Sequence, residues 1–441
     1  MTSEGKKKSP QHTLILGALI LGAVSGLAAQ WLLPGGSKNE VLKWFIDNIA
    51  SNVGNIFLAM IFMVVVPLLF SALALGVAEI GDVAKVGRVG IKALLVTLLL
   101  SSIAVALGLA AVNLVKPGEG IPVEIRTEII ESGKEAALKR GAVPDAPAQD
   151  PPVVGTVPRN PLLEATRALS GGLMPFMFFT LVFGLALAVV PAEKAAPVKA
   201  FLDGLFAVTL QMIEFAMKLA PIGVFCLVFQ TGASLGLDIF IAVLKYALLV
   251  LAVLAIHLFG VYSIVLSVFA KRNPLVFFKQ MKTVMMTAFA TSSSNATLPT
   301  ALKAAEEEVG LPGDISNFVL TVGATANQNG TALFEGITII FLCQLYGVNL
   351  DLSTQAWVML MAIIAGIGTA GVPGGAWPMI ASIVKTLKVP AESIGLVLGI
   401  DRILDMSRTV LNVTGDMVIA CCVTQWEGRG KVVNVPEDAQ G

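Results

Sequence analysis

The stretch GATANQNGTALFEG, residues 323–336, interrupts two runs that otherwise read as membrane-spanning helix. An unpaired polar group in the hydrocarbon of a bilayer costs several kcal/mol. The polar groups in this stretch must therefore be satisfied by other parts of the protein or by something that the protein binds. The residues concerned are Thr325, Asn327, Gln328, Asn329, Gly330 and Thr331.

Composition places the chain in the membrane. Of its 441 residues, 56% are hydrophobic and only 14% are charged, whereas charged residues make up roughly a quarter of a soluble domain. We therefore expect an all-α polytopic membrane protein. The net charge is zero and no basic stripe occurs, so the sequence predicts no nucleic-acid partner. No nucleophile–base pair, phosphate-binding loop or metal cluster indicates an enzyme, and the four cysteines read as free buried thiols.

Plain apolar runs predict six membrane spans. The first follows KKKSPQH and is too long for a cleaved signal core, so we interpret it as a retained helix. Basic loops near residues 85–88, 194–199 and 271–282 predict a cytoplasmic N-terminus. Residues 116–160 are polar and proline-rich, which predicts an extracellular insertion. The six spans are 13–34, 51–75, 91–115, 171–191, 201–231 and 240–270.

After residue 283, polar clusters interrupt the apolar runs. Serine-rich, or glycine- and proline-rich, tips cannot face lipid, but they fit re-entrant hairpins that line a cavity. Two such units in series indicate an internal repeat, and paired broken segments point to a transporter's binding site near the middle of the bilayer. The clusters are TSSSNATLP (291–299), NQNGT (327–331), GTAGVPGG (368–375) and DRILDMSRTVLNVTGD (401–416).

The last cluster predicts a polar face on a helix. Asp401, Asp405, Arg408, Asn412 and Asp416 follow one another at intervals of 4, 3, 4 and 4 residues, which places them on one side. A self-neutralising salt-bridge network that joins two helices would explain the pattern without a ligand. Ionisable residues inside a membrane are nevertheless functional candidates by default. Three acids with one base also leave spare negative charge, which favours a bound cation.

The same residues suggest a zwitterionic ligand. The guanidinium group of Arg408 suits a carboxylate, and Asp405 can accept hydrogen bonds from an ammonium group. Hydroxyl and backbone N–H groups of the hairpin tips suit a second carboxylate. Together these groups describe an acidic amino acid. Sodium prefers oxygen ligands, which Asn327, Asn412, Asp416 and carbonyl groups of a broken helix would supply.

In order and spacing, the four clusters resemble the dicarboxylate/amino acid:cation symporter family, which includes the excitatory amino-acid transporters. The resemblance covers residues 13–424. It implies a homotrimer in the plasma (inner) membrane with both termini cytoplasmic. It also implies eight transmembrane helices, two re-entrant hairpins, inverted repeats and an elevator movement. The expected division is a tail (1–12), scaffold helices (13–115), the insertion (116–160), further scaffold and transport helices (161–282), the transport core (283–426) and a tail (427–441).

The resemblance also assigns residues to the sites. It places sodium at one site with Gly323, Asn327, Asn412 and Asp416, and at a second with backbone near Thr325, Gly366, Ile367 and Thr369. A glutamate at position 335 is typical of relatives that co-transport a proton, and a buried carboxyl can hold a proton at neutral pH; a structural carboxyl is the alternative. Substrate contacts are implied at Ser292, Ser293, Ser294, Thr331, Val372, Pro373, Gly374, Gly375, Ala376, Asp405, Arg408, Thr409 and Asn412.

One departure from the family concerns a third sodium site. Relatives usually read NMDGT where this chain reads NQNGT, so Gln328 and Asn329 replace the methionine and the carboxylate. On the third helix, the family's Thr-Ser pair and tyrosine correspond to Leu100, Ser101 and Thr97. Our hypothesis is that this third site is absent or altered and that fewer sodium ions are coupled. Drift at a tolerated position is the alternative.

Three functions remain open at this point. The first is a symporter that imports aspartate or glutamate with sodium and, through Glu335, a proton. The second is a related symporter for C4-dicarboxylates or another amino acid, including a proton-coupled or weakly coupled variant that lacks the third sodium site. The third is a gated anion pathway or substrate sensor that no longer concentrates anything.

Overall fold

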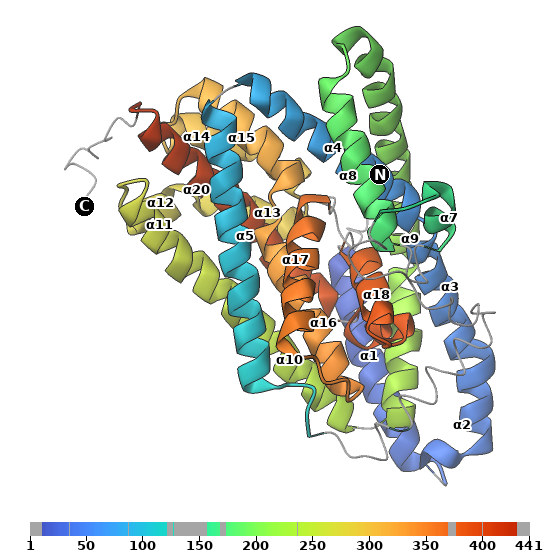
Figure 1. Ribbon diagram of the computed structural model, residues 1–441. Coiled ribbons are helices and arrows are strands. Elements are labelled where there is room, and N and C mark those ends of the chain that lie inside the picture. Colours follow the sequence, from blue (N-terminus) through green and yellow to red (C-terminus); the bar gives the residue numbers. More distant parts are fainter. Residues whose placement is uncertain are drawn as a thin grey trace, which may run out of the picture.

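The computed structural model describes residues 11–34, 36–86, 88–120, 127, 157–167, 173–235, 237–368, 376–398 and 400–429. Helices account for nearly all of these residues, and no strand occurs among them (Figure 1). An all-helical polytopic protein is therefore confirmed in its broad form. Most of the predicted tails and of the 116–160 insertion lie outside the described residues.

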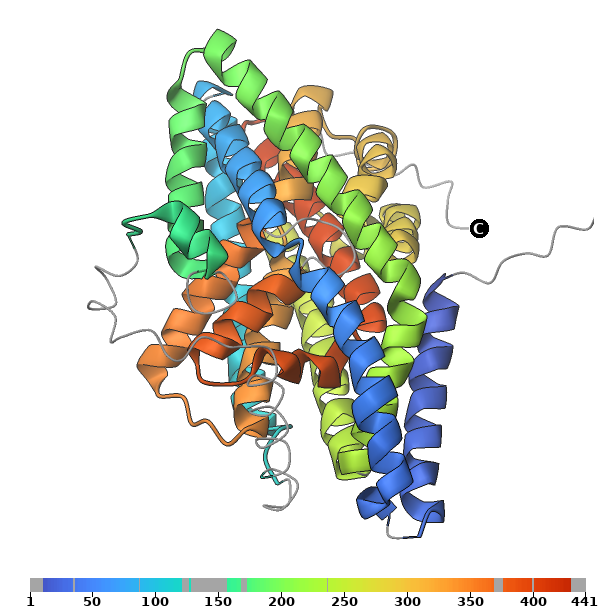
Figure 2. The same ribbon diagram turned by 90° about the vertical axis from the view of Figure 1, so that its right-hand side faces the viewer.

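The early helices form one packed group, which lies mainly on the right in Figure 1 and faces the viewer in Figure 2. Its longest member, α9, packs against α1, α3 and α4, and α4 also packs against α8. The bounds are α1 (Gln11–Leu32), α2 (Glu40–Phe45), α3 (Ser51–Phe62), α4 (Val65–Val86), α7 (Pro161–Thr166), α8 (Leu173–Val189) and α9 (Ala192–Leu235).

The later helices form a second group around α16 (Asn329–Leu345) and α20 (Asp401–Trp426), with α15 (Gly313–Ala326) packed against α20. The sequence prediction grouped residues 13–115 as scaffold. In the structure α5 (Arg88–Val115), the last helix of that range, packs along α16 and α17. The other members are α10 (Leu237–Ala255), α11 (Tyr262–Val268), α12 (Pro274–Gln280), α13 (Lys282–Thr291), α14 (Ser294–Glu307), α17 (Leu352–Gly368), α18 (Trp377–Thr386) and α19 (Gly395–Leu398).

Two predicted spans differ from the observed helices. The 51–75 run is split into α3 and α4 by a turn at Met63 and Val64. Pro67 explains the break, because it has no N–H group to donate to the carbonyl of Met63. The 201–231 run is part of the 44-residue helix α9, whose length of about 66 Å exceeds the ~30 Å hydrocarbon core of a bilayer.

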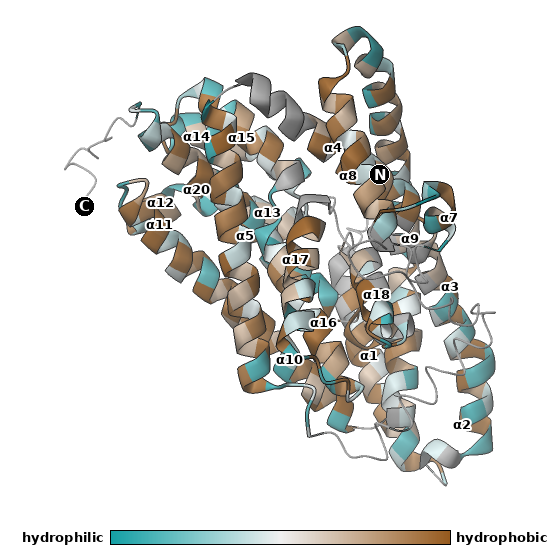
Figure 3. Cartoon of the chain, viewed as in Figure 1, coloured by the Kyte–Doolittle hydropathy of each residue, from teal (hydrophilic) through white to brown (hydrophobic). Residues whose placement is uncertain are grey.

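Apolar residues predominate along the long helices (Figure 3). In the described part of the chain, four helical stretches are long and apolar enough to cross a membrane: 88–115, 192–216, 237–268 and 401–426. On α5, Ile91, Leu95 and Leu99 are exposed, whereas Leu100 on the other face is fully buried. This arrangement suits a helix that faces lipid on one side and packs against protein on the other. The last stretch, α20, is almost wholly buried.

Helix interruptions occur close to the predicted polar clusters. Between α13 and α14 the chain turns at Ser292, which has a positive φ of 51°. Between α15 and α16, Asn327 and Gln328 leave the helical conformation. Residues 369–375, which separate α17 from α18, lie outside the described residues. Two of the three interruptions predicted at bilayer depth are thus present as helix ends facing the interior.

Candidate functional site

The polar side chains of α20 converge on α16 and on the broken connection before it. Asp405, Arg408, Asn412 and Asp416 are each at most 4% exposed, and Asp401 is 8% exposed. A helix brings residues at such spacings onto one face. The predicted polar stripe is therefore confirmed as a feature of the protein interior, where each charge must be compensated.

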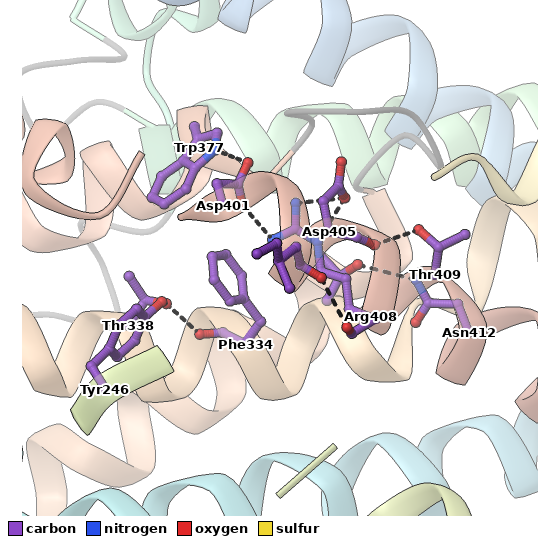
Figure 4. Close-up of polar contacts among 12 residues, drawn as sticks. Tyr246, Phe334, Thr338, Trp377, Asp401, Asp405, Arg408, Thr409 and Asn412 are labelled. Carbon is purple, nitrogen blue, oxygen red and sulfur yellow. Dashed lines mark hydrogen bonds and ion pairs between the residues drawn. The ribbon is translucent and has the colours of Figure 1, made fainter. Parts of the chain in front are cut away.

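Arg408 makes ion pairs with two carboxylates of its own helix. Its Nη2 lies 2.8 Å from Asp405 Oδ1, and its Nη1 lies 3.1 Å from Asp401 Oδ1. The indole Nε1 of Trp377 donates to Asp401 Oδ2 at 2.7 Å (Figure 4). The guanidinium group also stacks 4.2 Å from the centre of the Phe334 ring. The arginine is thus fixed in orientation by Asp401 and Asp405 of α20 and by Phe334 of α16, and Trp377 of α18 in turn holds Asp401.

This arrangement neutralises charge within α20, whereas the alternative interpretation of the sequence was a salt-bridge network that joins two helices. It accounts for Asp401 and Asp405, but it does not account for all the negative charge. Glu335 on α16 is completely buried and interacts electrostatically with Arg408. Asp416, two turns further along α20, makes no ion pair within the described residues. The carboxylate oxygens of Asp416 are therefore not paired by Arg408, and oxygens of this kind suit a cation.

Asn412 ties α20 to the start of α16. Its Oδ1 accepts from the backbone N–H of Gly330 at 2.7 Å, and its Nδ2 donates to Gln328 Oε1 at 2.5 Å and to Thr331 Oγ1 at 3.2 Å. Helix starts leave unpaired N–H groups, and Asn412 satisfies one of them. Gln328 in turn donates to the carbonyl of Ala324 at 3.1 Å. No site role was predicted for Gln328, although its position between α15 and α16 could have indicated that its side chain bonds to the site.

A second polar group surrounds Asp416. The Nδ2 of Asn327 donates to Asp416 Oδ1 at 2.6 Å, while Asn327 Oδ1 is buried without a hydrogen bond in the described part of the chain. Gly323 packs so closely that a Cβ atom there would fall on the Asp416 carboxylate. A buried carboxylate, a spare amide oxygen and nearby backbone carbonyls are hard oxygen donors of the kind that sodium prefers. These residues therefore fit a monovalent cation.

Asn329 occupies a third polar position, at which the family resemblance led us to expect a carboxylate. Its Oδ1 accepts from the hydroxyl of Ser101 at 2.5 Å, and its Nδ2 donates to the hydroxyl of Tyr262 at 3.2 Å. The Leu100 side chain beside Ser101 is fully buried and offers no oxygen. Asn329 therefore forms a neutral, hydrogen-bonded cluster with two hydroxyl groups from α5 and α11.

The serine-rich tip presents hydroxyl groups to the interior. Ser293 caps α14 by accepting from the N–H of Ala296 at 3.2 Å. The Oγ atoms of Ser292 and Ser294 are buried without hydrogen bonds in the described residues. Buried hydroxyl groups normally have a partner, so this tip has unused capacity to bind a polar ligand.

The remaining predicted residues divide into two sets. Ala376 is buried directly before α18, Thr409 donates to the carbonyl of Asp405 at 2.8 Å, and Gly366 packs against Ala332. Thr325 and Ile367 lie in the last turns of α15 and α17. The residues predicted in the second hairpin tip fall outside the described residues: Thr369, Val372, Pro373, Gly374 and Gly375.

Helices that are interrupted at buried charged side chains and at oxygen atoms without hydrogen bonds are typical of one class of protein, the helical membrane transporters. Within that class the chain belongs to the sodium:dicarboxylate symporter family, whose model matches residues 12–426. The chain is 32% identical over 421 residues to a proton/sodium-glutamate symport protein of Bacillus subtilis (strain 168), covering 94% of this chain and 92% of that protein.

Two further relatives have similar coverage. A proton/glutamate-aspartate symporter of Escherichia coli (strain K12) is 29% identical over 418 residues, which are 94% of this chain and 92% of that protein. A C4-dicarboxylate transport protein of Anaeromyxobacter sp. (strain K) is 27% identical over 400 residues, which are 88% of each chain. Membership of the family confirms the resemblance drawn from the four polar clusters.

Proposed function

We propose that this protein is a secondary active symporter that imports an acidic amino acid, aspartate or glutamate, together with cations. Two observations carry the proposal: the buried pair of Arg408 and Asp405 on α20, and the serine tip between α13 and α14, two helices that pack against α20, where the Oγ atoms of Ser292 and Ser294 have no hydrogen bond in the described residues. Arg408 would bind the side-chain carboxylate, Asp405 the ammonium group, and the serine tip the main-chain carboxylate. The glutamate and glutamate-aspartate symporters among the relatives support this substrate class.

Binding would require Arg408 to exchange part of its pairing with Asp401 and Asp405 for pairing with the substrate. A substrate with one ammonium and two carboxylate groups suits this exchange, because it supplies both signs of charge. Thr331, Thr409 and Asn412 lie beside the pair and would add neutral contacts. The predicted contacts of the second hairpin tip complete the proposed site.

We propose two sodium sites. One uses Asn327, Asn412, Asp416 and the backbone of Gly323, and the other uses backbone near Thr325 and at Gly366, Ile367 and Thr369. The third site of the family is closed by the cluster of Asn329, Ser101 and Tyr262, in which hydrogen bonds between neutral groups replace a carboxylate. Sodium and proton coupling in the names of the relatives supports cation coupling in this chain.

A C4-dicarboxylate is the second candidate substrate, since a C4-dicarboxylate transport protein is among the relatives. A dicarboxylate such as succinate would use Arg408 and the serine tip but leave Asp405 without an ammonium group to bind. Competition between succinate and labelled aspartate separates the two candidates. We expect aspartate to bind more tightly because Asp405 is buried beside Arg408.

The remaining architecture is proposed from the family. Eight transmembrane helices and two re-entrant hairpins would form each subunit of a homotrimer in the plasma (inner) membrane, surrounded by lipid and with cytoplasmic termini. The residue ranges predicted for scaffold, insertion and transport core stand as part of this proposal. The later helices would move across the membrane relative to the early ones.

The direct test is uptake of radiolabelled aspartate into proteoliposomes, with a sodium gradient or a proton gradient imposed separately. We expect sodium to drive accumulation and an inward proton gradient to increase it. In Glu335→Gln the proton effect should disappear, because the amide cannot carry a proton, while sodium-driven uptake persists. Absence of uptake under either gradient would refute the symporter assignment.

A further inference from the structure

A small cavity lies between α5, α15 and α20, apart from the substrate contacts. Its volume of about 30 Å³ exceeds the roughly 10–15 Å³ that one water molecule needs by this measure. The first half of α5 forms one wall, the second half of α15 the opposite wall, and Ile419 of α20 contributes to the lining. Lining residues that matter below are Gly90, Ala93, Thr97, Val322, Gly323 and Asn327.

The inner end of this cavity is the wall of the cation site. Asn327 and Gly323 line the cavity, and the same two residues contact the Asp416 carboxylate. The Asn327 side chain is 1% exposed, and its Oδ1 makes no hydrogen bond in the described part of the chain. An amide oxygen with free capacity therefore borders a space that can hold water.

The outer end of the cavity lies close to charged groups at the start of α5. Gly90 and Ala93 flank Lys92, whose Nζ pairs with Glu427 at 2.6 Å and whose side chain is 26% exposed. From Gly90 to Thr97 the cavity follows α5 for seven residues, or about 10 Å. The lining residues therefore run from positions near Lys92, which pairs with Glu427, to the two residues that contact Asp416.

We propose that this cavity is an aqueous antechamber. Through it the cation held by Asn327 and Asp416 exchanges with water at the Lys92–Glu427 end of the molecule, without passing the hairpin tips. The inference rests on the proposed cation site. A void lined only by apolar residues stays dry, but the lining of this one includes the polar residues Asn327 and Thr97.

Thiol labelling of the purified protein in nanodiscs tests the antechamber. Ala93→Cys places a thiol at the outer end and Val322→Cys at the inner end, whereas Leu95→Cys, on the exposed apolar side of α5, is the matched control. All four native cysteines are buried, so the parent chain serves as the blank. The probe is a small cationic methanethiosulfonate, and the reaction rate is followed by intact-protein mass spectrometry.

We expect both cavity thiols to react on the order of tenfold faster than position 95, because the reactive thiolate forms only in contact with water. Sodium at about ten times its Kd, in place of choline, should slow the reaction at position 322 roughly tenfold by mass action. If neither cavity thiol reacts faster than the control, the cavity is dry and the proposal is wrong. If sodium leaves the rate at position 322 unchanged, the cavity holds water but does not serve the cation, and the proposal is equally wrong.

Sodium-dependent aspartate binding, measured on the parent chain in the same nanodiscs, separates this inference from the proposed function. Sodium protection without aspartate binding would support the antechamber and refute the substrate. Aspartate binding with unreactive cavity thiols would support the substrate and refute the antechamber. The thiol rates do not depend on turnover, so a variant that transports slowly still gives an answer.

Discussion

At the scale of single residues, Arg408 is the centre of the proposed substrate site. It is 2% exposed, and its ion pairs with Asp401 and Asp405 offset the cost of burying all three charges. Breaking a buried pair by removing one partner typically costs about 3–5 kcal/mol. In the proposed function, a substrate carboxylate would therefore have to compete with Asp401 and Asp405 for Arg408.

Arg408→Gln should abolish high-affinity aspartate binding. The amide cannot form a charge-assisted pair with a carboxylate, and it leaves Asp401 and Asp405 facing each other without a cation. A loss of about 3 kcal/mol corresponds to an affinity more than a hundredfold lower. Titration calorimetry in saturating sodium measures the affinity for aspartate. Arg429→Gln is the control, since that arginine pairs with Asp314 at the exposed surface. If Arg408→Gln binds aspartate with unchanged affinity, Arg408 does not bind the substrate carboxylate.

Asn329 allows the cation count to be tested. We expect the double substitution Leu100→Thr with Asn329→Asp to add one coupled sodium ion, because it returns two oxygen donors and a negative charge to the cluster beside Ser101. The ratio of sodium to aspartate follows from the reversal potential in proteoliposomes. Leu100→Thr alone, which adds no charge, should keep the parent ratio. A parent ratio of three sodium ions would show that the neutral cluster does not close the third site.

At the scale of helices, the proposed cation site lies where α15 closely approaches α20. Gly323→Ala places a methyl group against the Asp416 carboxylate, and overpacking of this kind costs roughly 1–3 kcal/mol. We expect the sodium concentration needed for half-maximal aspartate binding to rise about tenfold or more. Gly204→Ala on α9, where a Cβ meets no atom within 4 Å, should leave it unchanged. Equal sodium dependence in both variants would contradict the position assigned to the site.

Sequence periodicity predicted the helices and the helix break of the candidate site, but it did not predict which side chains form hydrogen bonds with one another. The helical stripe from Asp401 to Asp416 and the break at Asn327 follow from local spacing and composition, and the structure confirms both. The indole of Trp377 bonding Asp401, and Gln328 bonding Asn412, depend on tertiary packing that no local pattern encodes.

Packing between helices was also beyond the sequence pattern. Apolar composition predicted α5 as a span but not its partners, because a helix with one lipid-facing side can pack equally well on several neighbours by composition alone. The turn between α3 and α4 shows the reverse case. Pro67 was visible in the sequence and could have predicted that break.

At the scale of the whole molecule, an ion-pair cluster joins the start of α5 to the end of α20. Glu427 pairs with Lys92 at 2.6 Å and with Arg88 at 3.3 Å, and Lys92 also donates to the carbonyl of Trp426 at 3.0 Å. These contacts connect two helices of the later group at a common end, next to the cavity between them. A change in this cluster should therefore affect how firmly α5 stays attached to α20.

The cluster predicts a specific dependence of stability on pH. The hydrogen bond from Lys92, with the positive charge of Arg88, lowers the pKa of Glu427 below its ordinary value. A carboxyl whose pKa is lower in the folded state stabilises the fold above its unfolded pKa, about 4.3, and loses that contribution as the pH falls through the folded value. Glu427→Gln should therefore lower the Tm at pH 7, and the difference from the parent should shrink as the pH falls below about 4.

Thermal unfolding in detergent, followed by circular dichroism, gives the Tm of the parent and of Glu427→Gln as a function of pH. Glu214→Gln is the matched control, because Glu214 forms an exposed pair with Lys218 within α9, and exposed pairs within one helix contribute little. Salt should reduce the effect of Glu427→Gln, since the cluster lies at the hydrated end of α5. If the Tm difference is the same at pH 7 and pH 3.5, the carboxylate charge does not hold α5 to α20, and the attachment rests on apolar packing along the two helices.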